Sequence, residues 1–328
     1  MTMELNPKFE TLFLLMYSQW GDEEEAEFVK ALNEFGVDGQ EFYNRNYHVV
    51  EKYITAFQKY KVESPGTQLL QDIDDASLIG VYADIFWRNP DWFDNIKAVP
   101  KDEVSAEMNI TLKEVVEDSH GIIAALESLG LSSDTKWKIM LLRHSPKKHL
   151  DIVAAAVRDN LPAFEKARDK VSGELAVLLD NAGAIFNDPN KTRFIQMAHK
   201  MVPGASIVPT LAVPVAVMVL EDVVFYGLLT DKATNDSAEF TKEELMIGAK
   251  ALSEKSKLEI LMALKGTSLY GSEIAETIGL TAATVSHHMG TLIATRFLEM
   301  EKRNGKVYYR LAPKGIERFL AGVGHLLL

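Results

Sequence analysis

The sequence predicts a mainly α protein of the α+β class, with a large, mostly helical N-terminal domain and a smaller C-terminal domain. Three observations support this fold. Apolar residues recur at helical spacing through the first two hundred positions, as at Tyr43, Tyr47 and Ile54. Val and Ile then dominate residues 205–229, which predicts a small β element. A polar stretch at 231–241 separates this element from a final pattern of short helices and a hairpin.

The N-terminal domain is expected to continue as helices after its first hundred residues. These helices are predicted near 111–129, 134–143, 148–159, 161–182 and 191–201. Residues 205–219 and 223–229 predict a pair of strands, joined by a polar turn at Glu221 and Asp222.

Residues 202–220 carry no charge over 19 positions, which raises a membrane span as an alternative. Pro203, Pro209 and Pro214 interrupt this stretch, and proline at that density breaks a helix. Buried strands are therefore the preferred interpretation, and no membrane partner is expected.

The net charge of the chain changes sign near the same position at which the sequence patterns change. We predict a mostly helical domain at 1–230, a linker at 231–241 and a C-terminal domain at 242–328. Residues 1–245 carry 24 Lys and Arg against 40 Asp and Glu, a net charge of −16. Residues 246–328 carry 11 against 7, a net charge of +4. An acidic body with a basic tail is expected when only the tail contacts phosphate.

The C-terminal domain has the pattern of a helix-turn-helix. Two helices are expected at 242–253 and 255–265, the second with Leu258, Leu261, Met262 and Leu264 inward. Ser272 is expected to cap the next short helix, and Gly279 permits the tight turn after it. Thr281 then caps a helix from Ala282 to about Thr295, whose inward positions are Val285, Met289, Leu292 and Ile293. This second helix is placed for the major groove of double-stranded DNA.

A hairpin follows the second helix directly. Residues 297–301 and 306–311 are strand-like, and Asn304-Gly305 between them is a strong hairpin turn signal. Lys302, Arg303 and Lys306 surround the tip, where cationic side chains reach phosphate or the minor groove. The DNA-binding wing is therefore predicted at Lys302, Arg303, Asn304 and Lys306.

Residues 251–311 resemble the ArsR-type winged-helix regulators. The matching segments are Ser272-Glu273-Ile274-Ala275, Gly279-Leu280-Thr281, Thr284-Val285-Ser286-His287-His288-Met289 and Gly305-Lys306-Val307-Tyr308-Tyr309-Arg310-Leu311. The resemblance implies a homodimer with paired recognition helices that usually represses transcription. Carried over by position, it places six recognition-helix residues against DNA: Thr281, Ala282, Thr284, Ser286, His287 and Thr291.

The sequence departs from this family at its metal-sensing segment. Members that sense arsenic or soft metals use a Cys-x-Cys stretch, whereas residues 267–271 read Thr-Ser-Leu-Tyr-Gly and the chain has no cysteine. Thiolate sensing is therefore excluded. Adjacent residues on a helix point in different directions, so His287 and His288 are not expected to chelate one ion. No metal site and no cofactor are predicted, and we expect one of the two histidines at DNA and the other packed inside.

The N-terminal domain is larger than a winged helix needs for dimerisation, and its role stays open between a sensor and a scaffold. Phe86, Trp87, Trp92, Phe93 and Trp137 either line an effector pocket or fill a core. An enzyme is disfavoured because the chain has no Gly-x-Gly-x-x-Gly, P-loop, His-Glu-x-x-His or Gly-x-Ser-x-Gly motif.

We therefore expect a cytoplasmic, homodimeric DNA-binding transcriptional regulator, acting as a repressor. Its DNA affinity would be modulated by a small-molecule or protein effector at the N-terminal domain. The segment MTMELNPKFE lacks the layout of a secretory signal, in keeping with that location. The alternative is an interaction scaffold whose winged helix contacts proteins rather than DNA.

Overall fold

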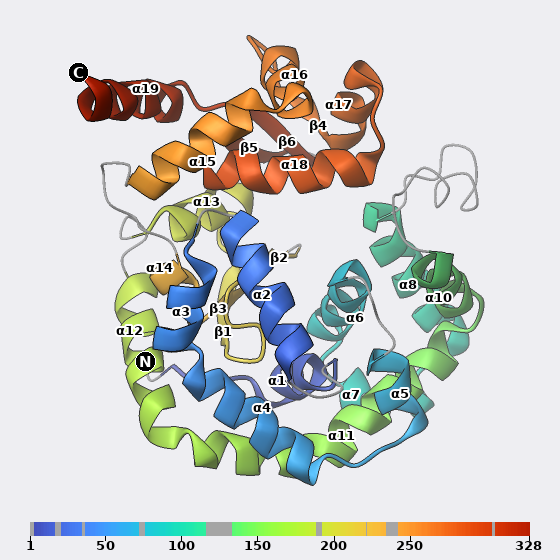
Figure 1. Ribbon diagram of the computed structural model, residues 1–328. Coiled ribbons are helices and arrows are strands. Elements are labelled where there is room, and N and C mark those ends of the chain that lie inside the picture. The colour runs from blue at the N-terminus through green and yellow to red at the C-terminus, as the bar shows by residue number, and fades with distance from the viewer. Residues whose placement is uncertain are drawn as a thin grey trace.

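The computed structural model describes residues 3–16, 21–34, 37–71, 76–115, 133–187, 192–220, 222–233, 242–303 and 306–328. Within these residues the chain forms two parts, which Figure 1 shows as a larger lower part and a smaller upper part. We call residues 3–233 the body and residues 242–328 the head. Each part has its own cluster of buried apolar side chains. The predicted mainly α fold with small β elements is confirmed.

The body is built mostly from helices. In chain order they are α1 Pro7–Leu14, α2 Asp22–Glu34, α3 Gly39–Asn46, α4 His48–Tyr60, α5 Pro65–Gln71, α6 Ala76–Arg88, α7 Trp92–Asn95, the 3-10 turn η1 Ile96–Ala98, α8 Lys101–Val115, α10 Ser133–His144, α11 Pro146–Lys170, α12 Ser172–Phe186, α13 Arg193–Met201 and α14 Thr230–Ala233. Residues 231–233 thus belong to α14 rather than to a linker, and 234–241 lie outside the described residues. Most of the helix expected at 111–129 also lies outside them.

Helix α11 is the central helix of the body. It packs along α4, and α1, α5 and α7 also lie against it (Figure 1). The predicted break before Pro162 is wrong, because α11 continues through this proline to Lys170. Val157 before the proline and Phe164 after it are both fully buried in the same core. Packing on both sides therefore maintains a helix that proline alone would interrupt.

A three-stranded sheet crosses the body in the order β1-β3-β2. Its strands are β1 Ser206–Thr210, β2 Val217–Val219 and β3 Val223–Gly227. Strand β2 pairs antiparallel with β3, as expected, whereas β1 is a separate strand parallel to β3. The single strand expected over 205–219 is therefore wrong, because the chain leaves the sheet between Thr210 and Val217. No helix among the described residues has the length and apolar character needed to cross a membrane.

Glu10 joins three segments of the body. Its carboxylate is fully buried and accepts a hydrogen bond from the Tyr53 hydroxyl at 2.8 Å. It also accepts from the backbone N–H groups of Leu211 and Ala212, each at 3.1 Å. Helix α1, helix α4 and the segment after β1 are thereby fixed to one another. Burial raises the pKa of Glu10 to about 7, although these hydrogen bonds favour the charged form.

The aromatic residues considered for an effector pocket mostly fill this core. Phe86 and Phe93 stack inside it with ring centroids 4.1 Å apart, and Trp92 is also buried. Trp87 packs against Phe9, with ring centroids 5.7 Å apart. Trp137 differs from the others, because it is 61% exposed on α10. Phe86, Trp92 and Phe93 therefore belong to the core of the body, whereas Trp137 lies at its surface.

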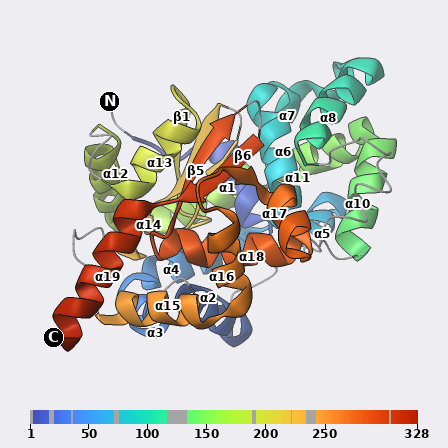
Figure 2. The same ribbon diagram turned by 90° about the horizontal axis from the view of Figure 1, so that it is seen from above.

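The head carries the predicted helices and hairpin. Its elements are α15 Lys242–Ser253, α16 Lys255–Ala263, β4 Leu269–Tyr270, α17 Gly271–Ile278, α18 Ala282–Ala294, β5 Leu298–Arg303, β6 Lys306–Leu311 and α19 Pro313–Leu327. Its sheet has the order β4-β6-β5, so the wing has a third strand that the sequence analysis does not include. The side chains of α17, α18 and β5 meet in a core of their own. Figure 2 shows the head from above, over the body.

Candidate nucleic-acid interface

Helices α17 and α18 form a helix-turn-helix whose turn is set by two local residues. Gly279 ends α17 with a φ of 70°, in the left-handed region that favours glycine. The Thr281 hydroxyl then accepts a hydrogen bond from the backbone N–H of Thr284 at 3.2 Å and caps α18. Both roles were predicted and are confirmed. The cap on α17 differs, because the Glu273 carboxylate, not Ser272, accepts from the Tyr270 N–H at 3.0 Å.

One face of α18 is fixed in the core of the head. Val285, Met289 and Leu292 are buried there, as predicted from their helical spacing. The helix also packs against α16, α17 and β5. These contacts hold α18 rigidly, as a helix that must enter a groove requires.

The N-terminal turns of α18 present polar groups to solvent. Thr281, Ser286 and His287 are exposed. Thr284 is half-buried, and its hydroxyl lies 2.8 Å from that of Thr281. Hydroxyl and imidazole groups can donate to and accept from base edges. The side chain of Ala282 lies outside the described residues.

Thr291 is a correction to the predicted set of DNA-facing residues. Its side chain is only 8% exposed. Thr295, one helical turn later, is buried as well. Helix α18 packs against α16, α17 and β5, and these two polar positions in its C-terminal half are shielded from solvent. The exposed surface of this helix is therefore confined to its first two turns.

His287 and His288 divide as the sequence analysis expects. His287 is exposed, whereas His288 is half-buried, and the two ring centroids are 5.9 Å apart. The Nδ1 atom of His288 is buried without a hydrogen-bond partner among the described residues. Burial and the charge of Lys257 lower the pKa of His288, so its neutral form is favoured.

Lys257 is a residue of this interface that the sequence analysis missed. It is 6% exposed at the start of α16 and forms an ion pair with Glu254. The inward face of α16 is therefore Lys257, Ile260, Leu261 and Leu264. Leu258 and Met262, predicted inward, are 42% and 67% exposed, so the predicted face is wrong at these two positions. A buried lysine is unexpected from residue type alone, and only the adjacent Glu254 signals it.

The wing consists of β5 and β6, which pair antiparallel. Arg303 pairs with Lys306 in the strand register, which leaves only residues 304 and 305 to close the hairpin. Those two residues, including Asn304, and the side chain of Lys302 lie outside the described parts of the chain.

Cationic groups of the wing lie on aromatic rings and beside carboxylates. Arg303 donates to the Glu301 carboxylate at 2.7 Å and lies over the Tyr308 ring. This ion pair lowers the pKa of Glu301 and raises that of Arg303. The Lys306 ammonium lies 4.2 Å from the centroid of the Tyr270 ring. Because Arg303 is about half exposed, it can exchange its carboxylate partner for a phosphate.

A comparison with protein families agrees with this geometry. Residues 254–299 match the family of bacterial regulatory proteins known as the arsR family. The matched segment begins at the N-terminus of α16 and ends in β5, so it contains the whole helix-turn-helix. An arsR-type domain of this kind indicates a DNA-binding transcriptional regulator. No curated protein and no solved structure matches the chain.

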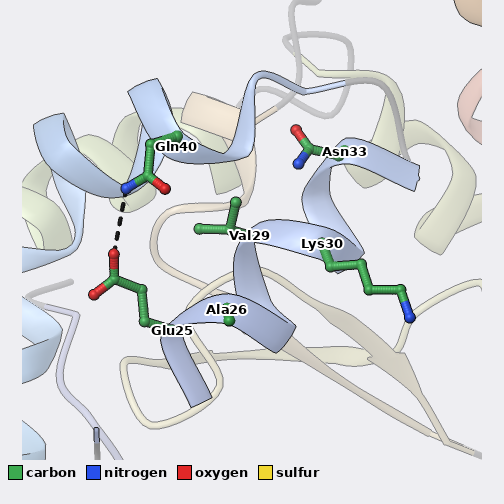
Figure 3. Close-up of a pocket in the computed structure, with 6 residues that line it drawn as sticks. All are labelled: Glu25, Ala26, Val29, Lys30, Asn33 and Gln40. Carbon is green, nitrogen blue, oxygen red and sulfur yellow. Dashed lines mark hydrogen bonds between the residues drawn. The ribbon is translucent and has the colours of Figure 1, made fainter. Parts of the chain in front are cut away.

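Among the described residues of the body, α2 and α3 form a shallow surface pocket. It has a volume of about 420 Å³ and lies where α2 meets α3 (Figure 3). Gln40 donates to Glu25 across it at 3.3 Å, and four of its six lining side chains are exposed. A ligand pocket normally encloses most of its ligand with apolar groups, and this one does not. The pocket therefore assigns no effector.

Proposed function

We propose that this protein is a sequence-specific DNA-binding transcriptional regulator that acts as a homodimeric repressor. The observation that carries the proposal is the capped, rigidly packed α18, whose first two turns expose Thr281, Ser286 and His287. These turns enter the major groove and read base edges. Thr284 contributes its hydroxyl beside them. Since the target is DNA, the protein acts in the cytoplasm.

The wing supports binding by contacting the sugar-phosphate backbone. Arg303 and Lys306 are placed at the hairpin tip, beyond the end of the helix-turn-helix. Contacts to phosphate fix the register of a protein on DNA without reading its sequence. The net charge of +4 on residues 246–328 is modest, so one head supplies few phosphate contacts. Two heads on one duplex double that number.

A second copy of this chain is the occupant that best fits the surface of α15 and α19. Leu320 and Leu327 on α19 are 59% and 74% exposed, and Met246 on α15 is 63% exposed. These two helices cross closely at Gly248, where Phe319 packs against the backbone. Both helices belong to the head, and α19 extends away from α18 in Figure 1. Pairing through this surface leaves both recognition helices available.

The body provides the means of control. Its cores and helices are separate from the helix-turn-helix, so an effector bound there must act by changing how the head is held. The chain has no cysteine, so the effector is a ligand or partner that binds without protein thiolates. When the head is able to bind DNA, the dimer occupies its target sequence and represses transcription from it.

Selection from a random duplex library tests the proposal. The full chain is incubated with the library at moderate salt, and bound duplexes are sequenced over several rounds. We expect enrichment of a two-fold symmetric sequence with half-sites about one helical turn, or a multiple of it, apart. Absence of any enriched sequence would contradict the proposal.

One observation favours the scaffold as a second candidate. Leu258 and Met262 form an exposed apolar pair on α16, and such surfaces can bind other proteins. The same selection separates the two functions, because a scaffold enriches no duplex. The variant Leu258→Ser, Met262→Ser keeps duplex selection unchanged if the protein reads DNA with α18.

A further inference from the structure

Helix α13 lies between the edge strands of two separate sheets. Strand β2 is at the edge of the body sheet, and strand β5 is at the edge of the head sheet. Helix α13 packs against both of them. Figure 2 shows α13 beside β5. The helix thus covers two strand edges that would otherwise expose unpaired backbone groups.

The apolar side of α13 belongs to neither of the two cores. Ile195, Ala198 and Met201 are at most 7% exposed, so they are as buried as core residues. They are nevertheless absent from the buried clusters of both the body and the head. Helix α13 is strongly amphipathic, and its apolar face is used to join the two parts.

This junction determines what α18 faces. In Figure 1, α18 lies on the side of the head that faces the body. Seen from above in Figure 2, body helices lie beneath α18. A recognition helix inserts into a groove about 12 Å wide and about 8.5 Å deep, so a whole duplex must approach that side of the head. The body occupies the side from which the duplex has to come.

Charge opposes DNA in the same arrangement. Residues 1–245, which include the whole body, carry a net charge of −16. A body with a net negative charge repels a duplex and weakens its approach at moderate salt. Steric and electrostatic effects therefore act in the same direction.

We propose that α13 is an autoinhibitory clasp: while it holds β5 against the body, α18 is closed to DNA, and duplex binding requires α13 to release the head. The proposal rests on the proposed DNA-binding function. It gives the body a route to regulation, because an effector that loosens or tightens α13 changes the fraction of heads able to bind.

The clasp contains a polar defect that suits a releasable contact. The Nε2 atom of His199 on α13 is buried and has no hydrogen-bond partner in the described part of the chain. A buried polar atom without a partner weakens the packing around it. An apolar residue at this position would remove the defect and hold the clasp more firmly.

Spin labels on two exposed residues test the proposal directly. The chain has no cysteine, so Val177→Cys on α12 and Met262→Cys on α16 are labelled without side reactions. These residues are 60% and 67% exposed and lie in the body and the head respectively. Distances are measured by pulsed EPR, with excess unlabelled protein to suppress signals between subunits. The probe is a duplex enriched by selection with the full chain, and its binding is followed by fluorescence anisotropy.

We expect a narrow distance distribution in the free protein and a different one when the duplex is bound. A bound duplex with an unchanged distribution overturns the clasp but leaves the proposed function standing. If no duplex binds at all, the proposed function fails, and the clasp fails with it.

A substitution in the clasp provides a second test. Ala198→Asp places a charge at a buried position of α13, whereas Val177→Asp adds the same charge at an exposed position of the body. We expect Ala198→Asp to bind the selected duplex about tenfold more tightly, and Val177→Asp to change the Kd by less than about twofold. An unchanged or weaker affinity of natively folded Ala198→Asp contradicts the clasp. If this variant does not fold, the spin-label measurement decides, because it alters no clasp residue.

Discussion

Replacing Glu10 by Gln should remove a pH dependence from the stability of the body. Glu10 hydrogen-bonds to Tyr53 of α4 and to the backbone after β1 at the same time. Gln has nearly the same shape and no charge, and its single carbonyl oxygen can replace the Glu10 oxygen that accepts from the Tyr53 hydroxyl and the Ala212 N–H. Its amide nitrogen can only donate, and it takes the place of the hydroxyl of a protonated Glu10. Ala can accept none of these hydrogen bonds and leaves three buried donors without a partner.

The expected magnitude follows from the pKa of Glu10. Burial raises this pKa from 4.5 to about 7, so the folded body binds a proton more tightly than the unfolded chain does. At about 1.4 kcal/mol for each tenfold change in proton affinity, the difference amounts to about 3 kcal/mol. The stabilisation is complete below pH 4.5 and is lost as the pH rises from 4.5 through 7. Glu10→Gln lacks this loss.

Urea unfolding followed by tryptophan fluorescence measures the effect in the body alone. All four tryptophans lie before residue 138, so the head contributes no signal. The measured quantity is the free energy of unfolding of Glu10→Gln minus that of the natural protein. This difference should rise by about 2 to 3 kcal/mol as the pH increases from 5 to 8. Glu165→Gln, at an exposed position of α11, serves as the control and should follow the natural protein.

Parallel pH profiles for the natural protein and Glu10→Gln would refute this reasoning. Glu10→Ala separates burial from hydrogen bonding. It should be destabilised by about 1 to 3 kcal/mol for each donor left buried and unsatisfied, at every pH.

Three further predictions concern the head. Gly248→Ala should destabilise the head by about 1 to 3 kcal/mol, because the new Cβ would lie 2.4 Å from the Phe319 ring. Urea unfolding followed by circular dichroism measures this change. Gly271→Ala is the control and should cause no such loss, because a Cβ there meets nothing within 4 Å. Since burial and Lys257 lower the pKa of His288, thermal stability of the head should fall as the pH drops below about 6.5, and His288→Gln should flatten this profile. Replacing Arg303 or Lys306 by Ala should weaken binding to all duplexes alike, and the slope of log K against log salt concentration should fall by about 1 for each lost phosphate contact. Ser286→Ala should instead change the preferred base. Base-specific effects of the wing variants would contradict their assigned role.

Features set by neighbouring residues were accessible from the sequence. The Thr281 cap, the left-handed Gly279 and the hairpin on either side of residues 304 and 305 each depend on a few consecutive positions. The apolar spacing of Val285, Met289 and Leu292 also identified the buried face of α18 correctly. Local hydrogen bonding and helical geometry determine all of these features.

Features set by distant contacts were not accessible. Thr291 has the residue type of a solvent-facing position, but tertiary packing in the head buries it. From residue type, Lys257 is expected at the surface and Leu258 in the core, but the structure has them the other way round. An ion pair with Glu254 allows the lysine to be buried. Helix α11 passes Pro162 because both of its halves pack into one core. Tertiary packing overrides residue preference at each of these positions.

The bridging role of α13 also depends on tertiary structure. Its amphipathic pattern predicts a helix with one buried face, and a helix was expected at 191–201. The sequence does not show which elements cover that face. Contact with β2 and β5 becomes visible only when the body and the head are placed together.

The central claim is that α18 reads a DNA sequence, and the ratio of two dissociation constants tests it most directly. The full chain is titrated, at one moderate salt concentration, with the duplex enriched by selection and with a scrambled duplex of equal length and composition. We predict that the selected duplex binds at least about 10³-fold more tightly, and that a Ser286→Ala, His287→Ala variant loses most of this ratio. Equal affinity for both duplexes would contradict the claim.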